Sequence, residues 1–362
     1  MLIGTKILDL SRVLAGPLCS MMLGDLGADV IKVERPVFGD DTRGWGPPFD
    51  ARGESAYFLS VNRNKLSVAA DLDSVADRDL LRRLIAQADI VIDNFRRGTL
   101  ERRGLDPDAL LKQHPRLVWC TITGFGAETD RLGYDFVVQA ESGWMAITGE
   151  PDGDPMKTGV ALADVLAGKD AAIAILAALV ARERTGRGKR LFVSLVDSAA
   201  AALVNVAQNT LVSGADARRW GNAHPNLVPY QLFQAADRAL VIAVGTDPQW
   251  TACARALDLD ELASEAALAT NAGRVAHRER VVTALAGRLA DRDASHWVER
   301  LAGAGVPSGV VRSVLEVLNE TAAASPLAGM PSSVGGHVRR VPPRLDEHGA
   351  RVRAAGWEAF EA

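Results

Sequence analysis

Short apolar runs alternate with helical patterns along the first third of the chain. The runs are rich in β-branched and aliphatic side chains, as expected of buried strands, and they lie at residues 6–10, 29–34, 66–72, 89–93 and 117–123. Apolar residues recur at helical spacing in two of the intervals, at 16–27 and 77–88. Strands that alternate with helices are typical of a parallel sheet covered by helices. The pattern therefore predicts an α/β, Rossmann-like large domain.

A long helical pattern starts close to Asp164 and ends at Gly186, a residue that commonly terminates helices. Its apolar run Ala171–Ala181 has 11 residues. A membrane span needs about 20, so we expect a buried core helix. Asp164 has two interpretations: its carboxylate caps the helix, or it is a nucleophile that the helix dipole keeps ionised. The pattern alone leaves both open.

The second half of the chain has a different order of predicted helices and strands. An Ala-rich helix is expected from Asp197 to about Ser213, and a polar connection follows it. Beyond that connection, residues 230–234 and 240–244 predict a hairpin, and helical segments fill about 247–303. We therefore expect a large domain over 1–200 that is completed by 320–362, a linker over 201–229 and a smaller α+β domain over 230–319.

Composition limits the classes of function. The 362 residues include 41 basic and 45 acidic side chains, so the overall charge attracts neither nucleic acid nor an anionic membrane. Cys19, Cys120 and Cys253 are far apart, and with no signal-peptide pattern this predicts a reducing, cytoplasmic location. The six histidines never pair at helical spacing and no GxGxxG follows a strand. Neither a metal site nor a nicotinamide site is therefore predicted.

One predicted strand end is unusually basic. Ligands of parallel sheets bind just past the carboxyl ends of the strands. After the strand at 89–93 the chain continues with Asn94 and Phe95, and then places four guanidinium groups within eight positions, Arg96, Arg97, Arg102 and Arg103. Such a cluster forms either a solvated basic face or a phosphate-binding site, because arginine matches phosphate in geometry and charge. Its position after a strand favours the phosphate site.

Several stretches together resemble the family III CoA-transferases (CaiB/BaiF), which include formyl-CoA transferase, carnitine CoA-transferase and the 2-methylacyl-CoA racemases. Four stretches carry the resemblance: Leu8–Pro17, Leu26–Pro36 with Gly39–Arg43, Asn62–Lys65, and Gly133–Asp135 leading to Ala163–Asp164. Asn222–Pro225 and Pro342–Leu345 extend it across nearly the whole chain.

The resemblance implies that Asp164 is the nucleophile. Its carboxylate would attack an acyl-CoA thioester, give a mixed anhydride and then an aspartyl-CoA thioester, and pass CoA to a second carboxylic acid. Coenzyme A is then a substrate, and no metal or redox cofactor is needed. Residues 39–49 and 220–224 are similar to dicarboxylate transferases that use succinyl-CoA, which makes succinyl-CoA a candidate donor. The family also implies an interlocked homodimer.

Further site residues follow from the resemblance by position. Those that match CoA contacts are Arg12, Val13, Arg35, Lys65, Asn94, Phe95 and Arg102. Those assigned to the acid pocket are Trp45, Tyr57, Tyr134 and His224, and for the first three the alternative is ordinary core packing. In formyl-CoA transferase a Gly-rich lid occupies the place of 224–227. Here Pro225 fixes φ, which argues against a hinged lid, and Leu14 replaces a Gln of that enzyme, which argues against oxalate-like binding.

The racemases of the family are the main alternative function. They epimerise 2-methylacyl-CoA with a His at the position of Tyr134, paired with the Asp. Proton transfer requires a pKa near the working pH, and the unperturbed values are about 6.5 for His and about 10 for Tyr. Tyr134 therefore favours CoA transfer. A CoA-binding protein without catalysis is the third hypothesis.

Overall fold

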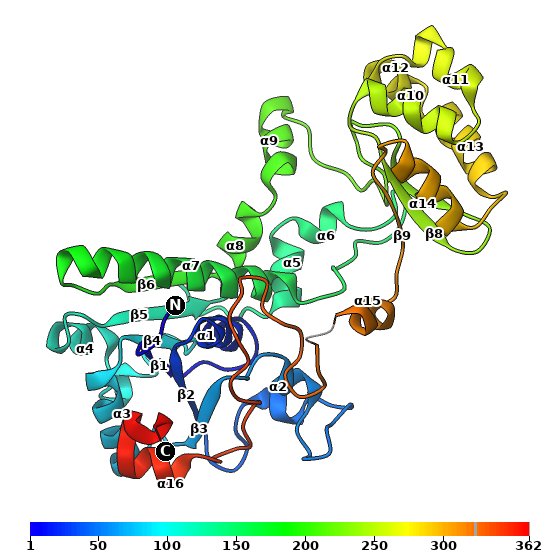
Figure 1. Ribbon diagram of the computed structural model, residues 1–362. Coiled ribbons are helices and arrows are strands. Elements are labelled where there is room, and N and C mark those ends of the chain that lie inside the picture. Colours follow the sequence, from blue (N-terminus) through cyan, green and yellow to red (C-terminus); the bar gives the residue numbers. More distant parts are fainter. Residues whose placement is uncertain (322–323, 362) are drawn as a thin grey trace. The chain divides into compact units, whose positions relative to one another are not determined.

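The computed structural model describes residues 1–321 and 324–361, which form two compact units (Figure 1). The large unit comprises Met1–Met145, Lys157–Ala217 and the C-terminal segment 324–361. The small unit comprises 146–156 and 218–321. The small unit thus includes a short stretch from the middle of the chain, and residues 201–229, expected as a linker, are divided between the two units.

A six-stranded parallel sheet forms the centre of the large unit, in the order β3-β2-β1-β4-β5-β6 (Figure 1). Its strands are β1 (Lys6–Asp9), β2 (Asp29–Glu34), β3 (Lys65–Ala69), β4 (Ile90–Asp93), β5 (Val118–Thr123) and β6 (Arg190–Ser194). The first five lie where apolar runs predicted strands. The pattern missed β6 because this edge strand is only partly buried and its apolar run, Leu191–Val193, is short. The predicted parallel α/β architecture is confirmed for this unit.

Helices cover both faces of the sheet. One face carries α1 (Ala15–Asp25), α7 (Leu162–Thr185) and α8 (Leu195–Ala201), and the other carries α3 (Val75–Gln87), α4 (Pro107–Gln113) and α16 (Gly349–Ala355). Small side chains on α7, among them Ala167 and Ala171, are fully buried. Their size allows this helix to pack closely against the sheet and against α1. Shorter elements of this unit are α2 (Ala56–Ser60), α5 (Asp135–Glu141), η1 (Asp41–Gly44), η2 (Glu101–Arg103) and η4 (Gly356–Phe360), and α6 (Trp144–Ile147) lies at its boundary.

The helix expected from Asp197 to Ser213 is two helices. α8 ends at Ala201 and α9 (Val204–Ser213) follows after a bend of 69°. Val204 has a positive φ of 33°, which interrupts the helical backbone at the bend. No single helix among the described residues is long and apolar enough to cross a membrane, and α8 with α9 meets the length and composition test only as a bent pair.

The small unit has an antiparallel sheet in the order β7-β8-β9, formed by β7 (Tyr230–Gln234), β8 (Ala239–Ala243) and β9 (Ser308–Val310). Its helices are α10 (Asp247–Ala256), α11 (Asp260–Ser264), η3 (Ala266–Leu268), α12 (Asn271–Ala276), α13 (Arg278–Leu289), α14 (Ala294–Gly303) and α15 (Val314–Glu320). Trp250 and Trp297 are fully buried in its core. The predicted hairpin and the helices after it are confirmed.

The C-terminal segment is tied to the large unit by bonds between distant parts of the sequence. The Arg63 guanidinium pairs with Asp25 at 2.6 Å and donates to the carbonyl of Ala328 at 2.6 Å. The Trp357 indole N–H donates to the carbonyl of Leu84 at 3.0 Å. Because Arg63 and Trp357 are both buried, the segment forms part of the large unit's interior.

Candidate active site

Two cavities open at the carboxyl end of the parallel strands, where ligands bind in folds of this kind. The larger, of about 590 Å³, is lined by residues that follow β1, β4 and β5 and by Asp164. The smaller, of about 360 Å³, is lined by residues that follow β1, β2 and β3. Arg12 and Phe95 line both, so the two cavities adjoin.

Asp164 lies in the first turn of α7 but does not cap it. The N-cap position is Ala161, which has no side chain able to accept the orphan N–H groups. The carboxylate of Asp135 does so instead: its Oδ1 accepts from the backbone N–H of Ala163 at 2.8 Å and of Asp164 at 3.4 Å. The capping interpretation of Asp164 is therefore wrong. Its carboxyl group is left to face the larger cavity.

The surroundings of Asp164 favour its neutral form. Burial raises the pKa of Asp164 to about 7, and the charge of Asp135 acts in the same direction. The backbone N–H of Ala15, the first residue of α1, acts against this rise because it favours the charged carboxylate. The expectation that the helix dipole keeps Asp164 fully ionised at neutral pH is thus corrected. A carboxyl group whose pKa lies near 7 in a cavity is typical of a reactive group.

Glycines set the spacing around Asp164. A Cβ on Gly168 of α7 would lie 2.7 Å from the carbonyl oxygen of Ala15, so only glycine lets the start of α1 approach α7 this closely. A Cβ on Gly124 would lie 2.5 Å from Cα of Gly133. This second contact closes the 124–133 loop, which lines the larger cavity.

Two of the arginines expected to contact CoA share one carboxylate. Arg12 pairs with Asp41 Oδ2 at 2.8 Å, and Arg35 pairs with its Oδ1. Both guanidinium groups are about half exposed. Arg35 lines the smaller cavity and Arg12 lines both. Asp41 thus holds two cations at the entrance to the smaller cavity, where a phosphate could bind them.

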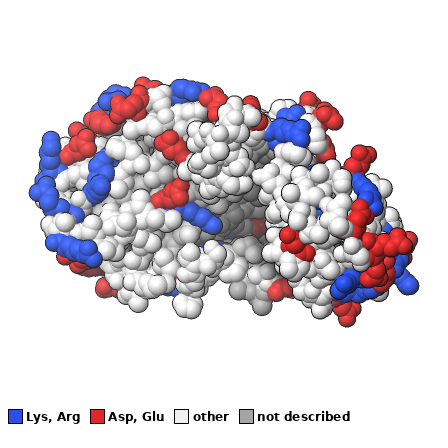
Figure 2. Space-filling view, turned by 90° about the horizontal axis from the view of Figure 1, so that it is seen from above, with Lys and Arg blue, Asp and Glu red and all other residues white. Residues whose placement is uncertain are grey.

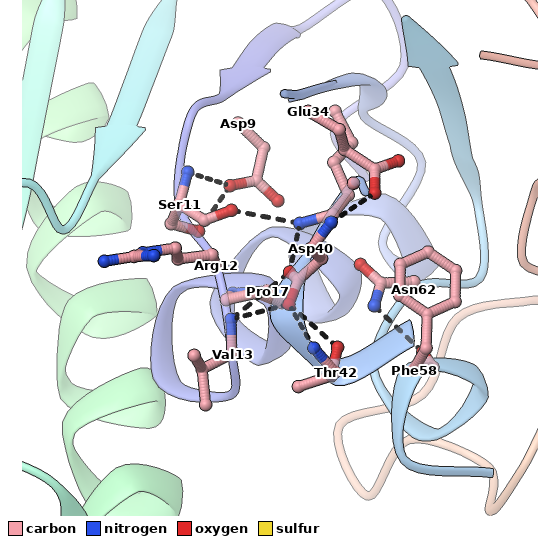
Figure 3. Close-up of polar contacts among 12 residues, drawn as sticks. Asp9, Ser11, Arg12, Val13, Pro17, Glu34, Asp40, Thr42, Phe58 and Asn62 are labelled. Atoms are coloured by element: carbon pink, nitrogen blue, oxygen red, sulfur yellow. Dashed lines mark hydrogen bonds and ion pairs between the residues drawn. The ribbon is translucent and has the colours of Figure 1, made fainter. Parts of the chain in front are cut away.

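Asn94 and Val13 contribute to the same edge of the sheet. The side-chain amide of Asn94 makes two hydrogen bonds to the backbone of Arg12. Its oxygen accepts from the Arg12 N–H at 3.1 Å, and its nitrogen donates to the Arg12 carbonyl at 2.8 Å. Val13 has a φ of +73°, a backbone conformation that β-branched residues rarely adopt. Asp40 accepts from the Val13 N–H at 3.2 Å (Figure 3). The structure therefore places Arg12, Val13, Arg35, Asn94 and Phe95 along the two cavities.

The arginine cluster is only partly at the cavities. Arg96 and Arg97 line the larger cavity, and Arg103 lines the smaller one while pairing with Asp73 at 3.0 Å. Arg102 lines neither, so the structure does not bring this predicted CoA contact to the site. Arg103 lines a cavity but was not assigned to CoA from the sequence. It belongs to the same arginine cluster as Arg102, and spacing alone does not distinguish the two. Elsewhere basic and acidic side chains are interspersed, as the face in Figure 2 shows.

Lys65 is a buried structural cation. It has no exposed surface, and its ammonium donates to Asp9 at 3.1 Å, to the carbonyl of Pro17 at 2.9 Å and to Asn62 at 2.9 Å. Three N–H donors are all that a lysine has, so none is left for an adenine or a phosphate. The predicted CoA contact of Lys65 is therefore wrong. Its β3 position is a strand start, not a strand end.

Of the three aromatic candidates in the large unit, Tyr134 lines the same cavity as Asp164, whereas Trp45 and Tyr57 line neither cavity. Tyr134 is 58% exposed and lines the larger cavity. Tyr57 is partly buried, and burial together with the charges of Asp164 and Asp135 raises its pKa to about 12. Trp45 is 43% exposed and packs edge-on against Tyr57 at 5.2 Å between ring centroids. Exposure of Trp45 and Tyr134 excludes ordinary core packing for these two.

His224 belongs to the small unit. Its Nδ1 accepts from the Asn226 N–H at 3.0 Å, and Arg278 donates to the carbonyls of His224 and Pro225 at 3.0 and 2.9 Å. Burial and the charge of Arg278 lower the pKa of His224. The segment expected in place of a Gly-rich lid is therefore bonded to its own unit. The role of His224 in the acid pocket stays a prediction.

Three comparisons identify relatives of the chain. The sequence profile of CoA-transferase family III matches residues 2–356. The chain is 43% identical over 320 residues to the succinyl-CoA:glutarate CoA-transferase of Mus musculus, covering 88% of this chain and 73% of the relative. It is 44% identical over 322 residues to the succinate–glutarate CoA-transferase of Agrobacterium fabrum, covering 87% and 80%. The crystal structure of a CaiB/BaiF family protein from Brucella suis superposes with a TM-score of 0.87 at 42% identity, covering 98% of both chains.

The profile spans almost all described residues, and the relatives share both sequence and architecture with this chain. The resemblance inferred from the motifs around Asp9, Asn62 and Asp164 is confirmed by these matches. The chain belongs to CoA-transferase family III, the CaiB/BaiF family, and is a CoA-transferase.

Proposed function

We propose that this enzyme transfers CoA from succinyl-CoA to glutarate or a similar short dicarboxylate, with Asp164 as the covalent nucleophile. The single observation that supports Asp164 most strongly is its carboxyl group at the larger cavity, with a pKa near 7 and its backbone capped by Asp135. The names of relatives that are 43% and 44% identical support the choice of acids.

The proposed reaction has four steps that balance without a redox or metal cofactor. Asp164 attacks the thioester carbonyl of succinyl-CoA; the C–S bond breaks and leaves a mixed anhydride and CoA thiolate. The thiolate attacks the aspartyl carbonyl, which releases succinate and gives an aspartyl-CoA thioester. Glutarate attacks that thioester and expels the thiolate, which then attacks the glutaryl carbonyl. Glutaryl-CoA leaves and Asp164 is restored as a carboxylate.

The two adjoining cavities support a placement for CoA. The nucleotide fits the smaller cavity, where Arg12, Arg35 and Arg103 converge from three segments, because guanidinium groups pair with phosphate. The pantetheine chain then passes Phe95, which lines both cavities, and brings the thioester towards Asp164. Partial shielding from water strengthens the carboxylate as a nucleophile once it is ionised.

A homodimer is part of the proposal. In the single chain, α9 has no buried residue, and its Leu211 and Val212 are 77% and 78% exposed. α15 likewise exposes Val314 and Leu315, at 76% and 66%. Exposed apolar helix faces of this kind support association. The interlocked arrangement rests on family membership, and light scattering of the purified protein tests the dimer. The three buried, free cysteines agree with a reducing compartment such as the cytoplasm.

The experiment that tests the proposal traps the enzyme during turnover. Purified protein is screened with succinyl-CoA against glutarate and other carboxylates, and the reaction is quenched with hydroxylamine or borohydride. Mass spectrometry is expected to locate the modified residue at Asp164. An adduct elsewhere contradicts the mechanism. Deuterium exchange at the acyl α-carbon without CoA transfer would favour the racemase alternative, and CoA binding without turnover on any acid would favour a non-catalytic protein.

A further inference from the structure

The backbone that follows β1 is held by buried side chains of another part of the large unit. We call Ser11, Arg12 and Val13 the strap. Lys32 of β2 donates to the Ser11 carbonyl at 3.0 Å, and Asp40 accepts from the Val13 N–H at 3.2 Å (Figure 3). Lys32 and Asp40 bond to each other at 2.9 Å, and neither side chain is exposed to solvent. The strap is thus fixed at both ends by one buried ion pair.

The hold on Val13 opposes a local conformational preference. Its φ of +73° is unfavourable for a β-branched residue, and such conformations persist only where the surroundings impose them. Asp40 is well prepared for this task, because Thr42 donates to it twice, through its backbone N–H at 3.0 Å and its hydroxyl at 2.8 Å. The acceptor that holds Val13 is therefore itself fixed at the start of η1.

The strap leads directly to the nucleophile. Two residues after Val13, the backbone N–H of Ala15 lies near the carboxyl group of Asp164 and favours its charged form. The carbonyl of Ala15 is pressed against Gly168, four residues further along α7. A displaced Val13 would therefore move Ala15 against both Asp164 and Gly168.

We propose that Asp40 and Lys32 are positioning residues for CoA transfer, which hold the strap in its strained conformation and so keep Ala15, at the start of α1, in place against the turn of α7 that carries Asp164. Both residues belong to the lining of the smaller cavity, but their side chains have no exposed surface, so in this assignment they act through the strap backbone and touch no reacting atom. The inference rests on the proposed role of Asp164 and adds to it two residues that act through the backbone. The groups that face Asp164 from the elements packed around it are Asp135 at the start of α5, Tyr57 on α2 and the Ala15 N–H of α1.

The neighbouring carboxylate provides a contrast. Asp41 bonds to the exposed guanidinium groups of Arg12 and Arg35 and makes no bond to the strap backbone. Asp40 is therefore expected to govern kcat, whereas Asp41 is expected to govern KM for the CoA thioester. Two adjacent residues of the same type thus give a matched pair for kinetic analysis.

The test compares Lys32→Met/Asp40→Asn with Lys32→Met/Asp40→Ala, so that no buried ammonium is left unpaired. The two differ in whether position 40 still offers an oxygen to the Val13 N–H. The Ala variant is expected to lower kcat by about tenfold or more relative to the Asn variant, with little change in KM. Asp41→Asn is expected to raise KM for the CoA thioester with little change in kcat. Equal kcat values in the two double variants, both folded by circular dichroism, would overturn the proposal.

A second readout does not depend on catalysis. Carbon-13 NMR of labelled aspartate follows the titration of Asp164, whose midpoint is expected to rise in the Asp40→Ala double variant as the Ala15 N–H moves away from the carboxyl group. An unchanged midpoint contradicts the inference even if activity falls. If the wild type shows no CoA transfer but the midpoint still moves, the proposed function fails and the positioning role stands.

A third variant covers the case in which the Ala variant does not fold. Glycine adopts positive φ without strain, so Val13→Gly should make the strap less dependent on Asp40. In the Lys32→Met/Asp40→Leu background, which keeps the size of residue 40 but offers Val13 no acceptor, it is expected to recover part of the lost kcat. An unchanged kcat in that background, or no recovery by Val13→Gly, overturns the proposal.

Discussion

Asp9 and Asp164 are two carboxyl groups at the same end of the sheet with opposite electrostatic surroundings. Burial by itself raises the pKa of both. Around Asp9 the charges of Lys65 and Lys32 and hydrogen bonds from Ser11 and Ser20 outweigh burial and hold the pKa at about 2. Near Asp164 the neighbouring charge is the carboxylate of Asp135, which adds to the effect of burial, and the pKa of Asp164 rises to about 7. The same residue type is thus a structural anion in one place and the proposed nucleophile in the other, according to the sign of the charges around it.

The largest effect is expected for Asp164→Asn on CoA transfer. An amide cannot form the anhydride, so turnover should fall by about three or more orders of magnitude, as in other enzymes that lose a covalent nucleophile. Asp170→Asn, an exposed position on the same helix, is the matched control and should keep its activity. Transfer by Asp164→Asn at near wild-type rate would contradict the assignment.

Removal of the other carboxylate should act on stability. Asp9→Asn leaves the buried ammonium groups of Lys65 and Lys32 with less compensation, which typically costs about 3–5 kcal/mol when a buried pair is broken. Urea unfolding at pH 7 measures the loss. Asp71→Asn, an exposed change near the same edge, serves as the control, and equal midpoints for the two variants would show that Asp9 is not a structural ion.

The pH dependence of stability should have the opposite sign at Asp164. Its pKa in the folded state, about 7, lies above the ordinary value of 3.8, so the native state binds the proton more tightly and stability falls as pH rises from about 4 to 7. Asp164→Asn removes this loss. The variant should be more stable than the wild type at pH 8, by up to about 4 kcal/mol at roughly 1.4 kcal/mol per pKa unit. Thermal unfolding at pH 4 and pH 8 tests this, and an equal difference at both would contradict it.

The packing between α1 and α7 offers an intermediate effect. Gly168→Ala introduces a Cβ 2.7 Å from the Ala15 carbonyl oxygen, and overpacking of this kind costs about 1–3 kcal/mol. The displaced Ala15 should also lower kcat. Gly287→Ala, where a Cβ meets nothing within 4 Å, is the control. Unaltered stability and kcat in Gly168→Ala would show that the helices can separate freely.

The smallest change is expected for Asp135→Asn. The amide oxygen can still accept from the N–H groups of Ala163 and Asp164, but the negative charge that raises the pKa of Asp164 is gone. The acid limb of the kcat/KM profile should therefore move to lower pH by about one unit or less. A shift towards higher pH would mean that Asp135 acts mainly by holding α7 in place.

Part of the site was accessible from sequence because its signals are local. The motif ending in Ala163-Asp164 pointed to the proposed nucleophile, and Arg12, Val13, Arg35, Asn94 and Phe95 follow strand ends that short apolar runs revealed. Lys65 was misassigned because a sequence motif does not show which way a side chain points. The Lys65 side chain points into the protein interior and bonds to Asp9, 56 residues away in the sequence. Arg102 and Arg103 could not be distinguished, since a cluster of arginines does not specify which one reaches a cavity.

The sequence by itself determined the parallel α/β sheet, the small α+β region, the long core helix and the family, because hydrophobic period and motif spacing are properties of neighbouring residues. Only the tertiary structure decided that Asp135, 28 residues before Ala163, caps α7, so that the Asp164 carboxyl group does not serve as the cap. It also decided that Lys32 and Asp40 hold the strap. Those relations depend on burial and on charges brought together by folding. A pKa near 7 for one aspartate and near 2 for another arises from those surroundings, which no local pattern encodes.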